Sequence, residues 1–271
     1  MGAFAPQAGL VHSHALETST GTALRWAGPS LDKGPLPAVF YFFTTAEESL
    51  TLDPYNQVIQ ALHGLALRCY SLTVPLHSSQ EDHGEAMQRW ATAMMTDHDP
   101  LSPFLDDALG CIDYLIQTDL IDADHLAVAG LSRGAFVATH CMAREPRIAA
   151  LLGFAPLTDP SLLPEFSSVQ SKPVFQQMAL QSCIPDLIGR KIRFYIGSRD
   201  ERVGTERCFH FVHQLADQSY AARVRSAPVE LIIGPSIGHK GHGTSPEVFK
   251  AGADWIRDEL QVQGFMEWQV E

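Results

Sequence analysis

Short apolar runs alternate with amphipathic helical patterns along this chain of 271 residues. The apolar runs have the length and composition of buried strands, and they lie at residues 37–43, 69–74, 125–130, 148–154, 192–196 and 229–233. Apolar residues at helical spacing lie between and after them, at residues 53–65, 86–95, 102–116, 135–143, 205–216 and 245–256. Strands that alternate with helices favour parallel pairing. The sequence therefore predicts an α/β fold whose mostly parallel central sheet is covered by helices on both faces.

A few segments fall outside this alternation. Before residue 37 the chain is polar and contains glycine, which is typical of a peripheral hairpin. Residues 77–83 form a polar run that predicts a long loop, and residues 156–190 mix Pro, Ser and Asp with short apolar groups. The second of these predicts a short lid or insertion over the sheet edge, not a full cap. Because α/β folds often fill this length with one core, we expect residues 1–271 to form a single domain.

Three dipeptides have the pattern of a helix N-terminus, in which a capping side chain precedes a proline at the first helical position. They are Asp53-Pro54, Ser102-Pro103 and Ser245-Pro246. Each is followed by apolar residues at helical spacing, so each predicts the start of a helix that covers the sheet.

The overall charge of the chain limits its partners. The formal net charge is −12, and clustered Lys and Arg that could grip a phosphate backbone are absent from the sequence, so nucleic acid is not an expected partner. No apolar stretch approaches the roughly 20 residues that cross a bilayer. The first ten residues lack the basic and apolar regions of a leader peptide, so we expect a cytoplasmic protein with no transmembrane segment.

The five cysteines are scattered, and no two have the C-x-x-C spacing of a metal site or redox dithiol. They predict reduced, mostly buried thiols.

Residues 130–134 read Gly-Leu-Ser-Arg-Gly and lie between the predicted strand 125–130 and the predicted helix 135–143. A strand-to-helix turn of this kind pushes the central side chain, Ser132, out above the sheet, and glycines at both ends allow so tight a turn. The helix N-terminus supplies backbone N–H groups and positive potential for a developing oxyanion. Ser132 is therefore predicted to be a nucleophile, and the alternative is that it only caps the helix.

A serine nucleophile needs a base within hydrogen-bond distance and an acid that orients the base. Asp200 directly follows the strand 192–196, at the edge of the sheet where α/β sites assemble, and it is the favoured acid. Glu201 is the rival, and either could be a solvated loop carboxylate.

The loop after the last strand reads Gly-His-Lys-Gly-His-Gly-Thr over residues 238–244 and offers two histidines as the base. Glycines flank His242 and the predicted cap Ser245 follows it, so His242 is favoured over His239. The H-x-x-H spacing also occurs in zinc sites, but the glutamate of H-E-x-x-H is missing and no metal site is predicted.

These motifs resemble the α/β-hydrolase superfamily, in particular its compact esterases and prolyl-oligopeptidase-like members. Residues 197–203 are similar to the G-x-x-D-x-x-V acid loop, and residues 242–247 are similar to the carboxylesterase ending in which the catalytic histidine precedes the terminal helix. The resemblance implies a triad of Ser132, Asp200 and His242, with backbone N–H groups of Thr44 and Arg133 as the oxyanion hole. The chain departs from many members at residues 42–45, where Phe-Phe-Thr-Thr replaces His-Gly.

The expected activity is hydrolysis of a carboxylic ester with a small or medium acyl group, through an acyl-enzyme and without a cofactor. The expected partner is thus a small acyl substrate. Two alternatives stay open. One is a peptidase or amidase of the prolyl-oligopeptidase-like group, and the other is a noncatalytic binding module, which would be expected to lose at least one member of the triad.

Overall fold

The computed structural model describes residues 11–77 and 85–262 and contains one sheet in these ranges. Its strands are β1 (His14–Glu17), β2 (Ala23–Ala27), β3 (Leu36–Phe42), β4 (Arg68–Ser71), β5 (Ile121–Leu131), β6 (Ile148–Phe154), β7 (Lys191–Gly197) and β8 (Val229–Gly234). They lie in the order β1-β2-β4-β3-β5-β6-β7-β8. β1 and β2 form an antiparallel hairpin, β2 pairs antiparallel with β4, and every other pair is parallel. The predicted parallel sheet and peripheral hairpin are confirmed.

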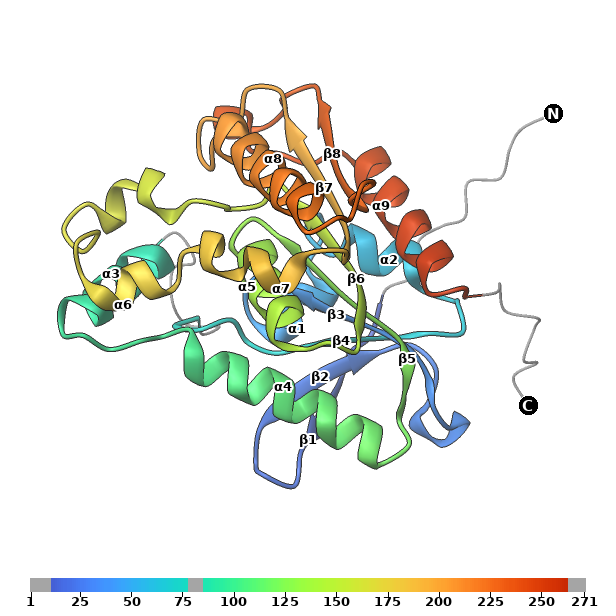
Figure 1. Ribbon diagram of the computed structural model, residues 1–271. Helices are drawn as coiled ribbons and strands as arrows, with labels where there is room; N and C mark the ends of the chain where they lie inside the picture. The colour runs from blue at the N-terminus through green and yellow to red at the C-terminus, as the bar shows by residue number, and fades with distance from the viewer. Residues whose placement is uncertain (1–10, 78–84, 263–271) are drawn as a thin grey trace.

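Helices cover both faces of this sheet (Figure 1). The α-helices of the described ranges are α1 (Ala46–Thr51), α2 (Gln57–Leu62), α3 (Ala86–Met95), α4 (Ser102–Gln117), α5 (Arg133–Arg144), α6 (Pro173–Gln177), α7 (Ile184–Leu187), α8 (Thr205–Ala221) and α9 (Pro246–Glu259). Helix α2 packs against α9 over one face, while α3, α4, α5, α7 and α8 contribute to the core on the other. The predicted α/β architecture is therefore confirmed.

The central strands supply side chains to both cores. In β3, Phe40 and Phe42 enter the core beneath α3, α4 and α5, whereas Val39 and Tyr41 enter the core beneath α2 and α9. All four are almost fully buried. Side chains alternate between the two faces of a strand, so a strand that is apolar at every position must be covered on both sides. Burial of each such side chain stabilises the fold by about 1.5–3 kcal/mol.

The Asp53-Pro54 prediction was wrong. The peptide bond between these residues is cis, and α2 begins later, at Gln57. An unpredicted helix, α1, precedes them, because Thr45 and Glu48 form a reciprocal capping box that starts a helix at Ala46. The Ser245 prediction is confirmed, since its Oγ accepts a hydrogen bond from the Val248 N–H at 3.4 Å and α9 begins at the next residue.

Residues 156–190, between β6 and β7, form only short helices and turns. Besides α6 and α7 they include the 3-10 turns η3 (Pro160–Leu162), η4 (Pro164–Phe166) and η5 (Leu180–Cys183). The segment packs on α3, α5 and α8. Its interpretation as a lid or insertion, and that of residues 1–271 as one domain, stay predictions. Most of the predicted loop 77–83 lies outside the described residues.

A buried arginine that the sequence patterns do not reveal joins three parts of this fold. Arg68, at the start of β4, donates hydrogen bonds to the carbonyls of Pro29, Ser30 and Gly34 and to that of Leu120 just before β5. Its side chain is fully enclosed. Since buried carbonyls need donors, this guanidinium connects the turn before β3 to the centre of the sheet.

The predicted burial of the thiols is confirmed, since all five cysteines are free and buried. Within the described ranges, no helix has the length and apolar character that crossing a membrane requires.

Candidate active site

Ser132 lies at the sharp turn between β5 and α5, with φ 57° and ψ −117°. Two glycines make this backbone possible. A Cβ on Gly130 would lie 2.2 Å from the carbonyl carbon of Gly134, and a Cβ on Gly134 would lie 1.8 Å from the carbonyl oxygen of Phe42. The Ser132 N–H donates to the Phe154 carbonyl at 2.8 Å, which ties the turn to β6. The strained turn thus fixes the serine above the carboxyl ends of the central strands.

Three side chains from separate loops form one hydrogen-bonded chain. His242 Nε2 lies 3.0 Å from Ser132 Oγ, and His242 Nδ1 lies 2.7 Å from Asp200 Oδ2. An ionised carboxylate only accepts, so Nδ1 carries the proton and Nε2 is left to accept the serine hydroxyl. This is the arrangement that deprotonates a serine.

The Asp200 carboxylate is held in place on both of its oxygens. Oδ1 accepts hydrogen bonds from the N–H groups of Arg202 at 2.9 Å and Val203 at 3.0 Å, while Oδ2 bonds His242. Its side chain is 0% exposed. A carboxylate held in place by several donors fixes the orientation of the imidazole ring.

The loop that carries His242 docks on the loop that carries Asp200. Gly241 has φ 71°, and a Cβ there would lie 2.1 Å from the Arg199 carbonyl oxygen. The Lys240 carbonyl accepts the Glu201 N–H at 2.9 Å. Glycine is required where the two loops approach so closely, and this contact sets the position of the imidazole.

The rival residues lie elsewhere. His239 begins the 3-10 turn η6 (His239–Gly241), is exposed, and does not take part in the hydrogen bonds that join Ser132, His242 and Asp200. Glu201 is exposed and pairs with Arg199 at 2.9 Å. The structure therefore brings together Ser132, Asp200 and His242, and it leaves His239 and Glu201 outside that chain. Across the described ranges, no cluster of three or more His, Cys, Asp or Glu side chains is arranged to hold a metal ion.

The two predicted oxyanion donors differ in their surroundings. Arg133 is the first residue of α5, where backbone N–H groups point out of the helix end. Thr44 is buried, and its N–H donates to Ser49 Oγ at 3.2 Å, as does the N–H of Phe43. Ser49 Oγ in turn donates to the Thr45 carbonyl at 2.7 Å. The Thr44 donor is thus directed at a serine of α1 in this structure, and its role in an oxyanion hole stays a prediction.

Two adjoining cavities open around His242. The smaller, about 340 Å³, contains Ser132 and Arg133, and its apolar walls include Met87 and Leu163. The larger, about 560 Å³, is lined by the loop of His242 and by Tyr55, Phe249, Arg202 and Glu165. Both share Tyr55, Leu131, Arg202 and His242.

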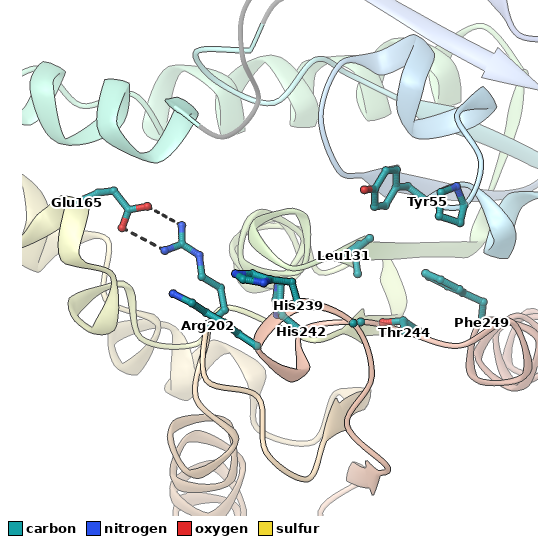
Figure 2. Close-up of a pocket in the computed structure, with 12 residues that line it drawn as sticks. Tyr55, Leu131, Glu165, Arg202, His239, His242, Thr244 and Phe249 are labelled. Carbon is teal, nitrogen blue, oxygen red and sulfur yellow. Dashed lines mark hydrogen bonds and ion pairs between the residues drawn. The ribbon is translucent and has the colours of Figure 1, made fainter.

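The larger cavity has a charged end and an aromatic end. Figure 2 shows Arg202 reaching toward Glu165 on one side, Tyr55 and Phe249 on the other, and the two histidines between them. Arg202 donates to both Glu165 oxygens, at 2.6 and 3.3 Å. Burial alone would raise the pKa of Glu165, but hydrogen bonds from Arg202 and the charges of Arg202 and Lys240 lower it below its usual value.

Sequence reasoning missed this ion pair. Arg202 lies in the predicted acid loop, but Glu165 belongs to the irregular segment 156–190, and no sequence pattern places it beside the site.

Solved structures with the same arrangement of strands and helices are numerous, although no protein-family model and no curated protein sequence matches the chain. TT1662 from Thermus thermophilus superposes with a TM-score of 0.68 at 18% identity, covering 93% of this chain and 99% of its own. A cold-adapted esterase from an Arctic intertidal metagenomic library gives 0.62 at 14% identity, covering 91% and 92%. Dipeptidyl peptidase 4 from Porphyromonas gingivalis gives 0.66 at 13% identity, covering 92% of this chain and 35% of its own.

The chain spans a little over a third of the peptidase chains that it matches, including the prolyl oligopeptidase B of Galerina marginata, of which it covers 37%. Identities this low establish the fold alone. The mostly parallel sheet, the helices on both faces and these neighbours show that the chain has the α/β-hydrolase fold.

Proposed function

We propose that the protein is a serine hydrolase in which Ser132 is the nucleophile, His242 the general base and Asp200 the acid that orients the base. The observation that carries this proposal is the continuous chain of hydrogen bonds from Asp200 through His242 to Ser132, at 2.7 and 3.0 Å. A serine that only capped α5 would hold its side chain on a helical N–H, and Ser132 makes no side-chain cap bond.

In the first half-reaction, Ser132 Oγ forms a bond to the acyl carbon while its proton moves to His242 Nε2. The carbonyl electrons move onto the oxygen, which the Arg133 N–H stabilises at the N-terminus of α5. When the tetrahedral intermediate collapses, the bond to the leaving oxygen breaks and His242 returns the proton to it. Water then attacks the acyl-enzyme by the same steps and releases the carboxylic acid with the free serine.

An ester is the proposed substrate, and the acyl group is small or medium in size. The cavity of about 340 Å³ around Ser132 suits a short acyl chain. Similarity to the cold-adapted esterase over 92% of that protein's chain adds support. The alternative of peptide or amide hydrolysis draws support from the peptidase neighbours, and the relative rates of ester and anilide hydrolysis separate the two.

The first prediction concerns labelling by a fluorophosphonate probe. The wild-type protein should be labelled, and Ser132→Ala should not be, because the probe traps an activated serine. Ser198→Ala is a matched control, since Ser198 is an exposed serine of the acid loop and its loss should leave labelling intact. Persistent labelling of Ser132→Ala would contradict the assignment.

Turnover separates the candidate functions. We expect p-nitrophenyl acetate and butyrate to be hydrolysed and the matching p-nitroanilides to be cleaved far more slowly. Faster cleavage of the anilides would favour a peptidase or amidase. Absence of both turnover and labelling would favour the noncatalytic module.

A further inference from the structure

Glu165 lies outside the proposed triad but is joined to it through Arg202. The Arg202 side chain donates to both oxygens of Glu165, at 2.6 and 3.3 Å, and its backbone N–H donates to Asp200 Oδ1 at 2.9 Å. One residue thus holds the acid of the triad and is itself held by a carboxylate from the segment between β6 and β7 (Figure 2). Polar contacts therefore run without a break from Glu165 through Arg202 and Asp200 to His242.

Glu165 has firm support from the core. It is the middle residue of η4, which is flanked by Leu163 and ends at Phe166, and both of these side chains are buried. The Phe166 ring packs against that of Phe175, with 5.4 Å between the centroids, and the Phe166 N–H donates to the Leu163 carbonyl at 3.0 Å. A carboxylate on such a turn can hold a partner in a fixed position.

The ion pair itself is partly shielded from water. The Glu165 side chain is 17% exposed and that of Arg202 is 31% exposed. Although burial opposes ionisation of Glu165, hydrogen bonds from Arg202 lower the pKa of its carboxyl, so it is charged at neutral pH. Two parallel hydrogen bonds between a guanidinium and a carboxylate fix direction as well as distance.

The loop that carries Asp200 is attached to two other parts of the site through adjacent residues. The Glu201 N–H donates to the Lys240 carbonyl at 2.9 Å, which joins the loop to that of His242. Arg202 joins it to Glu165. The Asp200 carboxylate meets the imidazole correctly only if this loop lies in the right place, and a displacement of about 1 Å can lower a catalytic rate about a hundredfold.

We propose that Glu165 is a positioning residue of the active site, which holds Arg202 and thereby fixes the loop that places Asp200 against His242. This inference rests on the proposed function and adds to it a residue from segment 156–190. In this role Glu165 affects the orientation of the base and not the binding of the substrate.

The first test is Glu165→Gln, with p-nitrophenyl acetate as the substrate. We expect kcat to fall about tenfold to a hundredfold, since the loop is no longer held by two charged groups. His242 serves both acylation and deacylation, so both steps should slow together and KM should stay nearly the same. Glu165→Asp keeps the charge and should recover part of kcat. An unchanged kcat with a raised KM in Glu165→Gln would instead indicate a substrate contact.

Two measurements separate positioning from a loss of folded protein. Each kcat is expressed per serine labelled by the fluorophosphonate probe at completion, so unfolded molecules do not contribute. The rate of labelling should fall together with kcat, because the probe reacts with the serine that His242 activates. Labelling of Glu165→Gln at the wild-type rate would contradict the inference.

A double-mutant cycle tests whether Glu165 acts through Arg202. Arg202→Gln should also lower kcat, and adding Glu165→Gln to it should cause little further loss, because the partner of Glu165 is already gone. If the two losses multiply in the double variant, the residues act independently and the inference is wrong.

Arg207→Gln is the matched control. Arg207 of α8 pairs with Asp159 at 3.5 Å, so this ion pair also joins segment 156–190 to the chain after β7. Its side chain is 51% exposed, and the pair lies outside the contacts that lead from Glu165 to Asp200. The control should keep the wild-type kcat, and a loss equal to that of Glu165→Gln would assign the effect to general support of the segment.

Failure of the inference differs from failure of the proposed function. If wild-type Ser132 is labelled and Glu165→Gln keeps the wild-type kcat, the inference fails and the proposed function stands. If the wild-type protein is neither labelled nor active on the ester, the proposed function fails and the inference fails with it.

Discussion

The imidazole of His242 makes two hydrogen bonds, and their directions determine what the ring can do. Nδ1 is 2.7 Å from a fully buried carboxylate, and Nε2 is 3.0 Å from a serine hydroxyl on a strained turn. His239 lies only three residues away in an exposed turn and has neither contact. Two histidines three residues apart therefore differ in what they can do. His242 is placed to accept the proton of Ser132, and His239 is not.

Replacing each of the two histidines by alanine should affect kcat differently. His242→Ala should lower kcat for p-nitrophenyl acetate roughly ten-thousandfold, because the base and the proton donor for the leaving group are both lost. His239→Ala should change kcat by less than about tenfold, since this side chain only lines the larger cavity. Circular dichroism would verify that both variants are folded, and a larger loss in His239→Ala than in His242→Ala would reverse the assignment.

Some residues and contacts of the site could be predicted from the sequence, and others could not. Ser132, Asp200 and His242 each follow a strand, in loops whose glycines and order along the chain are visible in the sequence, and they were predicted. The hydrogen bond from Thr44 to Ser49 and the ion pair between Arg202 and Glu165 were not. These contacts depend on where two side chains meet in space, and local patterns do not contain that information.

The strand-turn-helix from β5 to α5 is the element on which the site depends. Its geometry requires two positions without a Cβ, because backbone atoms that cannot move away occupy the space. The sequence predicted this element well, since both the apolar strand and the glycine spacing are local features. The start of α2 was predicted poorly: α2 begins at Gln57, not at Pro54, and its N-cap residue Asn56 makes no side-chain cap hydrogen bond.

Two glycine-to-alanine changes, one in this element and one in α4, should have opposite effects on stability. Gly134→Ala should lower the free energy of unfolding by at least about 3 kcal/mol, since the new Cβ would lie 1.8 Å from the Phe42 carbonyl oxygen. Gly110→Ala, on the exposed side of α4 with no atom within 4 Å of its Cβ, should raise it by about 0.5–1 kcal/mol. Urea unfolding would measure both, and equal stability of the two variants would contradict the packing described for the turn.

Across the whole molecule, buried polar groups join segments that are distant in sequence. Arg68 connects the turn before β3 with the sheet, and His140 of α5 connects that helix with residues 178–183. His140 Nε2 lies 3.1 Å from the Met178 carbonyl oxygen and Nδ1 lies 3.3 Å from Cys183 Sγ. Neither role could be predicted from the sequence, because a lone Arg or His in an apolar stretch shows no partner.

His140 makes stability depend on pH. Burial lowers its pKa to about 4, whereas the unfolded chain has a value near 6.5. Below pH 6.5 the unfolded state binds a proton that the folded state does not bind until about pH 4. The free energy of unfolding should therefore fall as pH drops through this window, by up to roughly 3 kcal/mol.

Urea unfolding at pH 7, 5.5 and 4.5 would measure this loss. Carboxylates such as the buried Glu145 and the partly buried Glu165 also have lowered pKa values and lose their contribution in acid, so the comparison is with His140→Asn. The variant should show a smaller decline between pH 7 and 4.5 than the wild type. An identical decline in both proteins would assign the effect to other groups.

The contact between Gly134 and the Phe42 carbonyl has a practical consequence for laboratory evolution. Randomising positions 130 and 134 would produce mostly unfolded clones, because a Cβ at either position meets backbone atoms. Met87 and Leu163 line the smaller cavity, which also contains Ser132. Met87 belongs to α3 and Leu163 to the segment after β6, so both lie outside the strand-turn-helix. Libraries aimed at new substrates should therefore vary these walls, where the cavity can change shape while the serine keeps its position.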